Sequence, residues 1–385
     1  PKLGQADEDA WRSRLDTSDP AVFYKVVRKA GERKDVDAAL PLLEAGVDAR
    51  FPHLAVTCGE ALRGNTWLET KGAHKAFGKW VKKANKAKGA KAENLARVLA
   101  AWGDPIVDEP LAALASGRRT PEIQGEALSM AAILDPARKA DFPETRAAVL
   151  KALKGRSDDV KAAACSAAAR IGDETFLDPL LALVRREKGK YAGLYAVWAL
   201  KQLGYTGGVD TFIHVLGSNP KKTTMQACLK AVTELATKAD IASLLTMSKH
   251  NKKDYRDAAT LALARLAHRG RFTPDAEVTG ENAETPATQS VPDAVIDRFI
   301  TLVREEKSWE VRDAARQGLL KLGGSAAAKV RADMPKLIEF SDEDTRQTAL
   351  ELCGLFQAKD AYAAAYKSAL YDKSRTVRMF AARAL

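Results

Sequence analysis

The residue types that most often bind metals or act as nucleophiles are dispersed along this chain of 385 residues. The cysteines stand in four separate apolar runs, with no CxxC spacing: Cys58, Cys165, Cys228 and Cys353. The five histidines are equally scattered and form no HExxH motif or two-histidine cluster. We therefore expect no metal and no cofactor, and we expect four free thiols used as small core residues, which favours a reducing compartment.

Catalytic motifs are also missing from the sequence. It has no glycine-rich phosphate loop, no GxSxG segment, and no nucleophile and base at the spacing of a known motif. We therefore expect that the protein is not an enzyme. Its charged side chains are then candidates for binding or for stability.

Positive charge is concentrated in residues 64–91. This segment has eight lysines and one acid, Glu69, whereas the whole chain has a net charge of +11. The inward stripe of an amphipathic helix is predicted at five positions: Ala73, Phe77, Trp80, Val81 and Ala84. The lysines of its outer face that are candidates for contact with a partner are Lys75, Lys79, Lys82, Lys83 and Lys86.

These lysines allow four interpretations. They form a solvated outer face, or a docking surface for an acidic protein or an acidic segment of the same chain. They bind a phosphate backbone without reading bases, or they lie on an anionic membrane surface, where Trp80 and Phe77 would insert. Lysine is a point charge and no exposed aromatics are interleaved with it, which argues against a specific reader of nucleic acid.

A second charge pattern places an acid two residues before a base at the start of alanine-rich helices. The copies are Asp159–Lys161, Asp254–Arg256, Glu310–Arg312 and Asp344–Arg346, with Thr376–Arg378 as a weaker fifth. Residues two apart do not face each other on a helix, so we predict that each acid meets the base of the neighbouring repeat. Exposed pairs of this kind contribute only about 0.2–1 kcal/mol each.

The same arginines have an alternative role at a ligand. If the ladder is incomplete anywhere, an arginine left unpaired would be the best contact for an acidic partner. The candidates are Arg256, Arg312, Arg346 and Arg378.

The acid–base pairs can meet from one repeat to the next only if the helices that carry them repeat at a fixed step along the chain. The best copy runs from Ser308 to Gly324, where apolar residues fall on one helix face, Ser308 is suited to the N-cap and glycine ends the helix. Residues 292–307 form a second amphipathic helix before it. Neither stripe is buried by the pair alone, and further copies follow at steps of about 31 to 37 residues, which is typical of a helical solenoid.

Two details of the repeats resemble the HEAT family. Several first helices have proline shortly before leucine, at Pro41, Pro110, Pro179 and Pro335. Several second helices open with Asp-Val-Lys or Glu-Val-Arg. The resemblance covers the chain from about Asp35 onward and implies an all-α, right-handed solenoid of about ten helix pairs, with the second helices on the inner surface. It also implies a non-enzymatic scaffold or adaptor, and many unrelated partners use this architecture.

Composition agrees with thin helices stacked closely, because only 6% of residues are aromatic. We predict N-terminal capping helices in residues 1–33, irregular repeats in 34–105, regular repeats in 106–271 and C-terminal repeats in 294–385. The last repeat is cut short, which predicts that the natural chain continues or that this end docks on something. Residues 272–293 carry five acids and no lysine or arginine, and form either a disordered insertion or a peptide that contacts a partner or the basic segment.

The predicted function is a scaffold that binds a macromolecule, most simply a protein, through the inner face or the lysine-rich helix. One alternative is a nucleic-acid-binding HEAT protein that uses residues 64–91. Another is a helical-repeat DNA alkylpurine glycosylase, although most of the six tryptophans have core-like spacing and that family's catalytic aspartate has no match. No membrane span or signal peptide is found, so we expect a cytoplasmic protein, with an exported mature protein and the oligomeric state left open.

Overall fold

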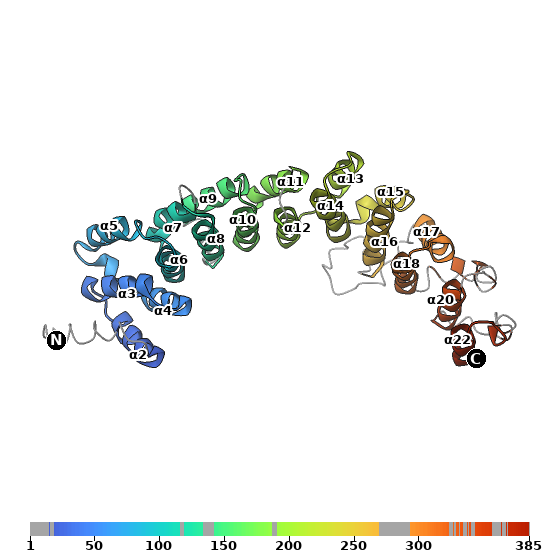
Figure 1. Ribbon diagram of the computed structural model, residues 1–385, viewed down its shortest axis with the longest axis horizontal. Coiled ribbons are helices and arrows are strands. Elements are labelled where there is room, and N and C mark those ends of the chain that lie inside the picture. The colour runs from blue at the N-terminus through green and yellow to red at the C-terminus, as the bar shows by residue number, and fades with distance from the viewer. Residues whose placement is uncertain are drawn as a thin grey trace, which may run out of the picture. The chain divides into compact units, whose positions relative to one another are not determined.

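A computed structural model describes Leu15 and residues 19–115, 119–133, 142–186, 191–268, 293–322, 343–355 and 369–384, with single positions between 326 and 367. Every regular element in these residues is a helix, which confirms the all-α prediction. The chain forms two compact units, Pro1–Gly204 and Tyr205–Leu385. Each unit is built from helices that pack side by side in two rows (Figure 1).

The first unit has a row of first helices and a row of second helices. The first helices are α3 (Val36–Asp48), α5 (Ala73–Ala84), α7 (Asp108–Ala115), α9 (Pro143–Leu153) and α11 (Leu177–Arg186). The second helices are α4 (Pro52–Leu62), α6 (Ala90–Trp102), α8 (Pro121–Ala131), α10 (Asp158–Ile171) and α12 (Ala192–Gln202). Helix α2 (Pro20–Gly31) packs on α4, and each second helix contacts the next along the row.

The second unit repeats this arrangement. Its first helices are α13 (Asp210–Gly217), α15 (Ile241–Met247) and α17 (Asp293–Glu305). Its second helices are α14 (Lys222–Leu235), α16 (Lys253–His268), α18 (Trp309–Leu322), α20 (Glu343–Leu355) and α22 (Arg375–Ala384). Again α14, α16, α18, α20 and α22 contact one another in sequence order.

Small residues let the second helices approach closely. In α10, Ala164, Ala167 and Ala168 are fully buried. Between α4 and α6 the approach is closer still, because a Cβ atom built on Gly59 would lie 2.8 Å from the Ala101 Cβ and 2.9 Å from the Trp102 backbone nitrogen. A side chain at Gly59 would therefore push the two helices apart.

Carboxylates of one repeat cap helices of the next. The Asp108 carboxylate on α7 accepts hydrogen bonds from the backbone N–H groups of Glu144 (2.8 Å) and Thr145 (2.7 Å) at the start of α9. The Asp158 carboxylate on α10 accepts them from Tyr191 (2.9 Å) and Ala192 (3.2 Å) at the start of α12. These bonds satisfy backbone donors that a helix N-terminus cannot pair by itself, so they join repeats as well as ending helices.

The predicted pair of helices around Ser308 is confirmed in α17 and α18. The buried residues of α17 are the predicted Val295, Ile296, Phe299, Ile300 and Val303, together with Leu302. Those of α18 include the predicted Val311, Ala314, Ala315, Gly318 and Leu322. Of the acidic segment 272–293, only Asp293 lies within the described residues, where it begins α17.

Candidate partner-binding surfaces

Two of the four candidate arginines join neighbouring repeats through bidentate ion pairs. Arg256 on α16 binds the Glu306 carboxylate, with Nε at 2.7 Å from Oε2 and Nη2 at 3.0 Å from Oε1. Arg346 on α20 binds the Asp372 carboxylate in the same way, at 2.7 and 2.9 Å. We call these contacts the inter-repeat clamps. Each carboxylate stands six residues before the next second-helix arginine, so the clamp is a repeated feature of the stack.

The other two arginines show where this pattern changes. Arg312 binds the Asp344 carboxylate of the next repeat at 2.5 Å, which confirms the predicted contact between an acid and the base of a neighbouring repeat. A clamp on Arg312 would need a carboxylate six residues before Arg346, but that position is Phe340. Arg378 donates to two backbone carbonyls, those of Asp372 (2.6 Å) and Lys373 (3.1 Å).

The acids used by the clamps differ from those predicted. Glu310, the ladder acid beside Arg312, lies 3.5 Å from Lys253 instead of pairing with Arg256. Glu306 lies just before α18 and Asp372 just before α22. Each carboxylate pairs with an arginine of the previous repeat. A partner that contacted Arg256, Arg312 or Arg346 would have to replace an ion pair, and such a role for the four arginines stays a prediction.

The clamps predict how stability depends on pH. Hydrogen bonding to Arg256 lowers the pKa of Glu306, and hydrogen bonding to Arg346 lowers the pKa of Asp372. Because each pKa is lower in the folded than in the unfolded chain, these groups stabilise the fold at neutral pH, and the stabilisation is lost as pH falls below 4.5, the ordinary value for Glu. Burial raises the pKa of Asp257, which opposes the trend.

We therefore expect the second unit to lose stability between about pH 5 and pH 3. Urea denaturation followed by circular dichroism across this range measures the effect. The variant Glu306→Gln cannot titrate at this position, so its stability should be lower at pH 7 and should depend less on pH. A pH profile identical to that of the wild type would exclude Glu306 as a main contributor.

The lysine-rich segment forms α5 with an exposed basic face, as predicted. Lys83 lies 3.4 Å from Glu44 on α3, and Lys91, in the first turn of α6, lies 2.6 Å from Asp48. The other six lysines of the segment are exposed and make no ion pair with the described residues, and four of them follow one another at i, i+4, i+7 and i+11: Lys75, Lys79, Lys82 and Lys86. We call these four the lysine stripe.

The buried side of α5 is narrower than predicted. Ala73, Phe77 and Trp80 are buried, but Val81 and Ala84 are only half-buried. Val81 faces an open groove between α5 and α7, so it has no helix to pack against. The predicted inward stripe is therefore only partly covered at Val81 and Ala84, and at Val81 the reason is the separation of α5 from α7.

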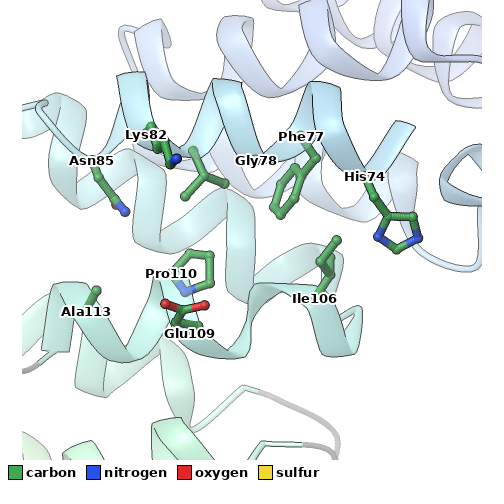
Figure 2. A pocket seen from close by; sticks show the side chains of 10 residues that line it. His74, Phe77, Gly78, Lys82, Asn85, Ile106, Glu109, Pro110 and Ala113 are labelled. Atoms are coloured by element: carbon green, nitrogen blue, oxygen red, sulfur yellow. The ribbon is translucent and has the colours of Figure 1, made fainter. Parts of the chain in front are cut away.

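The groove between α5 and α7 has a volume of about 380 Å³. Its α5 wall carries His74, Phe77, Gly78, Val81, Lys82 and Asn85. Its other wall carries Ile106, Glu109, Pro110 and Ala113 (Figure 2). The floor is mainly apolar, and Lys82 and Glu109 place opposite charges on the two walls. We call this cavity the α5–α7 groove.

An aromatic cluster supports α5 from below. The Trp67 ring lies 5.6 Å from Trp102 and 6.3 Å from Phe77, and the Phe77 ring lies 5.8 Å from Trp80. Trp67, Trp80 and Trp102 are all buried. These three tryptophans therefore form a core and are unavailable to stack on bases, which weakens the glycosylase alternative.

A different set of aromatics is exposed on α12 and at its N-cap, Tyr191. Tyr191 is 55% exposed, Tyr195 44% and Trp198 38%, and their spacing of i, i+4 and i+7 places them on one helix face. We call these three residues the aromatic ridge. Our sequence interpretation missed it because it treated most of the six tryptophans as core-like without separating Trp198 from the others. The aromatic spacing, opposite the buried Ala196 and Leu200, was the available signal.

The neighbouring helix makes the ridge distinctive. Aligning the helix ends Gly172 and Gly204 puts three α10 residues level with the ridge: Asp159, Ala163 and Ser166. These side chains are small or short, so the aromatic rings of α12 stand above the adjacent surface. The ridge is thus an apolar patch that the second-helix row of the first unit leaves open.

Sites for metals or reactive thiols do not emerge from the described residues. No group of three or more His, Cys, Asp or Glu side chains in them is arranged to hold a metal ion. Cys58, Cys165 and Cys228 are buried free thiols, and burial raises the pKa of Cys58 and of Cys228 to about 12, so neither is a nucleophile at neutral pH. No described helix is long and apolar enough to cross a membrane.

Solved karyopherin structures resemble this chain. Yeast importin-beta (Kap95p) matches with a TM-score of 0.50 and 13% sequence identity, over 99% of this chain and 50% of that protein. Kap121p matches with a TM-score of 0.58 and 9% identity, over 98% of this chain and 44% of that protein. The chain has the HEAT-repeat fold. This HEAT-repeat chain spans about half the length of the karyopherins it matches. No family model and no curated protein matches the sequence.

Proposed function

We propose that this HEAT-repeat chain is a non-enzymatic scaffold that binds a protein partner through its second helices, with the aromatic ridge of α12 as the main contact. The exposure of Tyr191, Tyr195 and Trp198 on one helix face carries the proposal. Tyrosine and tryptophan are the residues that most often supply binding energy at protein interfaces, because they bury a large rigid surface and retain one polar group.

The charge around the ridge supports a protein partner over a nucleic acid. Helices α8, α10 and α12 together carry four carboxylates and three basic side chains. A surface that binds a phosphate backbone through aromatic stacking needs a basic groove beside the rings, and this row does not provide one. An apolar or mixed protein surface fits a nearly neutral patch better.

Known structures with this fold give further support. They include a Kap95:Nup1 complex, at 13% identity and a TM-score of 0.54, and Kap121p bound to Ste12p, at 14% identity and a TM-score of 0.56. The HEAT-repeat fold therefore occurs in protein complexes. The buried free thiols of this chain also suit the reducing cytoplasm, which is where we propose that the scaffold acts.

Nucleic-acid binding through α5 is the second candidate function. The lysine stripe is exposed and lacks ion pairs among the described residues, so it is available to phosphates. Binding by several lysines would lose orders of magnitude in affinity between about 50 and 200 mM salt.

Quantitative affinity capture tests the scaffold proposal. The wild type and the variant Tyr195→Ser/Trp198→Ser are used as baits in nuclease-treated lysate, and bound proteins are compared by mass spectrometry. We expect at least a tenfold loss of the specific partner, roughly the effect of removing one interface hot spot. The matched control, Trp309→Ser/Tyr371→Ser, removes exposed aromatics from the second unit and should retain the partner. Equal capture by the wild type and the ridge variant would contradict the proposal.

A further inference from the structure

The α5–α7 groove is a second surface, separate from the aromatic ridge. Adjacent first helices α7 and α9 pack directly on each other, whereas α5 packs on α3 and the groove separates it from α7. The apolar side chains that this separation leaves at least partly accessible are Val81 on the α5 wall and Ile106 and Ala113 on the other, whereas Phe77 and Pro110 are buried at the base of the groove. An apolar segment that entered the groove would cover them.

Contacts from neighbouring repeats hold α5 in this position. Arg119, before α8, donates hydrogen bonds to the backbone carbonyls of Asn85 and Ala87 at the C-terminal end of α5. Lys83 pairs with Glu44 on the side facing α3. The groove is therefore fixed by the same repeat-to-repeat contacts that build the stack, and a ligand would find it already formed.

Gly78 keeps the centre of the groove open. A Cβ atom built at this position would meet no heavy atom within 4 Å. Glycine in a helix interior lowers helix stability relative to alanine, and packing inside the protein does not require it here. Its effect is to leave the groove surface between Phe77 and Val81 without a side chain.

The lysine stripe runs along the edge of the groove. The groove-facing residues of α5 recur at 74, 78, 81 and 85, and the stripe lies next to them round the helix at Lys75, Lys79, Lys82 and Lys86. The other wall carries Glu109, which is exposed. An occupant with an apolar face and acidic residues on the side toward α5 would satisfy both the floor and the stripe.

We propose that the α5–α7 groove binds an acidic amphipathic helix of a partner protein, with its apolar stripe against Val81, Ile106 and Ala113 and its carboxylates against the lysine stripe. This mode buries the side chains that the separated helices leave open and pairs lysines that have no partner among the described residues. The inference is independent of the ridge, because the two surfaces lie on different rows of helices.

Nucleic acid fits this groove less well than an acidic helix. A phosphate backbone would gain nothing from the apolar floor and would be repelled by Glu109. The nearby rings that would stack on bases, Phe77 and Trp80, are buried. Binding of DNA at this site is therefore the competing outcome in the test.

The test measures fluorescence anisotropy with three labelled probes. The first is an amphipathic peptide of about 18 residues with leucines at i, i+3, i+4 and i+7 and glutamates along one flank. The second has lysines in place of the glutamates, and the third is a single-stranded DNA of about 20 nucleotides. Each is titrated with the full chain at about 50 and 300 mM salt, because screening separates exposed charge contacts from apolar ones.

Two variants locate the binding. Ala113→Trp fills the groove from an exposed position, and Lys75→Glu/Lys79→Glu/Lys82→Glu reverses the stripe. We expect each variant to lower the affinity for the acidic peptide at least tenfold. The effect of the charge reversal should be smaller at high salt. The control Lys221→Glu/Lys222→Glu/Lys230→Glu makes the same charge change on α14 and should retain binding.

The inference is overturned if the acidic peptide binds no better than the lysine peptide, or if Ala113→Trp leaves its affinity unchanged. It is also overturned if DNA binds more tightly than the acidic peptide and only the charge reversal abolishes that binding. Neither outcome affects the scaffold proposal, because Tyr195 and Trp198 are intact in these variants.

Discussion

Replacing Arg346 with methionine is expected to destabilise the C-terminal helices α20 and α22 by about 3 kcal/mol. The Arg346 side chain is 7% exposed and that of Asp372 12%, so the ion pair between them is largely shielded from water. Methionine keeps much of the aliphatic volume but leaves the Asp372 carboxylate without its cation. Asp372 then retains only weaker partners, including the backbone N–H of Ser374 at 2.8 Å.

Hydrogen exchange at α20 and α22 measures this loss, because neighbouring repeats can unfold without the rest of a repeat stack. The control is Lys253→Met, which breaks the Lys253–Glu310 pair, in which the side chains are 52% and 69% exposed. We expect its effect to stay below about 1 kcal/mol. Equal protection factors in the two variants would show that the inter-repeat clamps contribute no more than surface ion pairs.

The substitution Gly59→Ala should destabilise the first unit by about 2–3 kcal/mol. The new methyl group would lie 2.8 Å from the Ala101 Cβ and 2.9 Å from the Trp102 nitrogen. The α6 backbone forms part of this contact, so no side-chain rotation relieves it. Helices α4 and α6 would have to separate, and the packing of the neighbouring Cys58 and Leu62 would be lost as well.

The matched control is Gly125→Ala, the same substitution in the interior of α8. A Cβ atom at Gly125 meets nothing within 4 Å. There alanine should stabilise the protein by about 0.5–1 kcal/mol, because it lowers the entropy cost of forming the helix. Urea denaturation followed by helicity compares the two. A similar loss in both variants would mean that the close contact of α4 and α6 is not the cause.

The repeat architecture was predictable because its signals are local. The stripes of α17 and α18 were predicted residue by residue, since apolar spacing and the N-terminal position of Ser308 depend on one helix at a time. The Arg312–Asp344 contact was also predictable, because it follows from stacking identical helices at a constant step. The resemblance to HEAT repeats then implied the order of the two rows.

The clamps and the groove were not predictable in the same way. Glu306 and Asp372 lie in turns, and only the stacked structure shows that a turn of one repeat reaches the arginine of the previous repeat. The α5–α7 groove depends on α5 packing toward α3, which no helical periodicity specifies. The sequence predicted Val81 on the inward stripe, because apolar spacing identifies the apolar face of a helix. That spacing does not show whether another helix covers each residue of the face.

The claim that a protein partner binds the aromatic ridge is tested most directly by hydrogen exchange on the complex. The protein captured by the wild-type chain is purified and mixed with the wild-type chain. Exchange is then followed in peptides spanning residues 191–202 and, for comparison, in a peptide that contains the exposed Trp309 of α18. The account predicts added protection in residues 191–202, and its loss in Tyr195→Ser/Trp198→Ser. A stable complex that protects other helices and leaves residues 191–202 unchanged would contradict it.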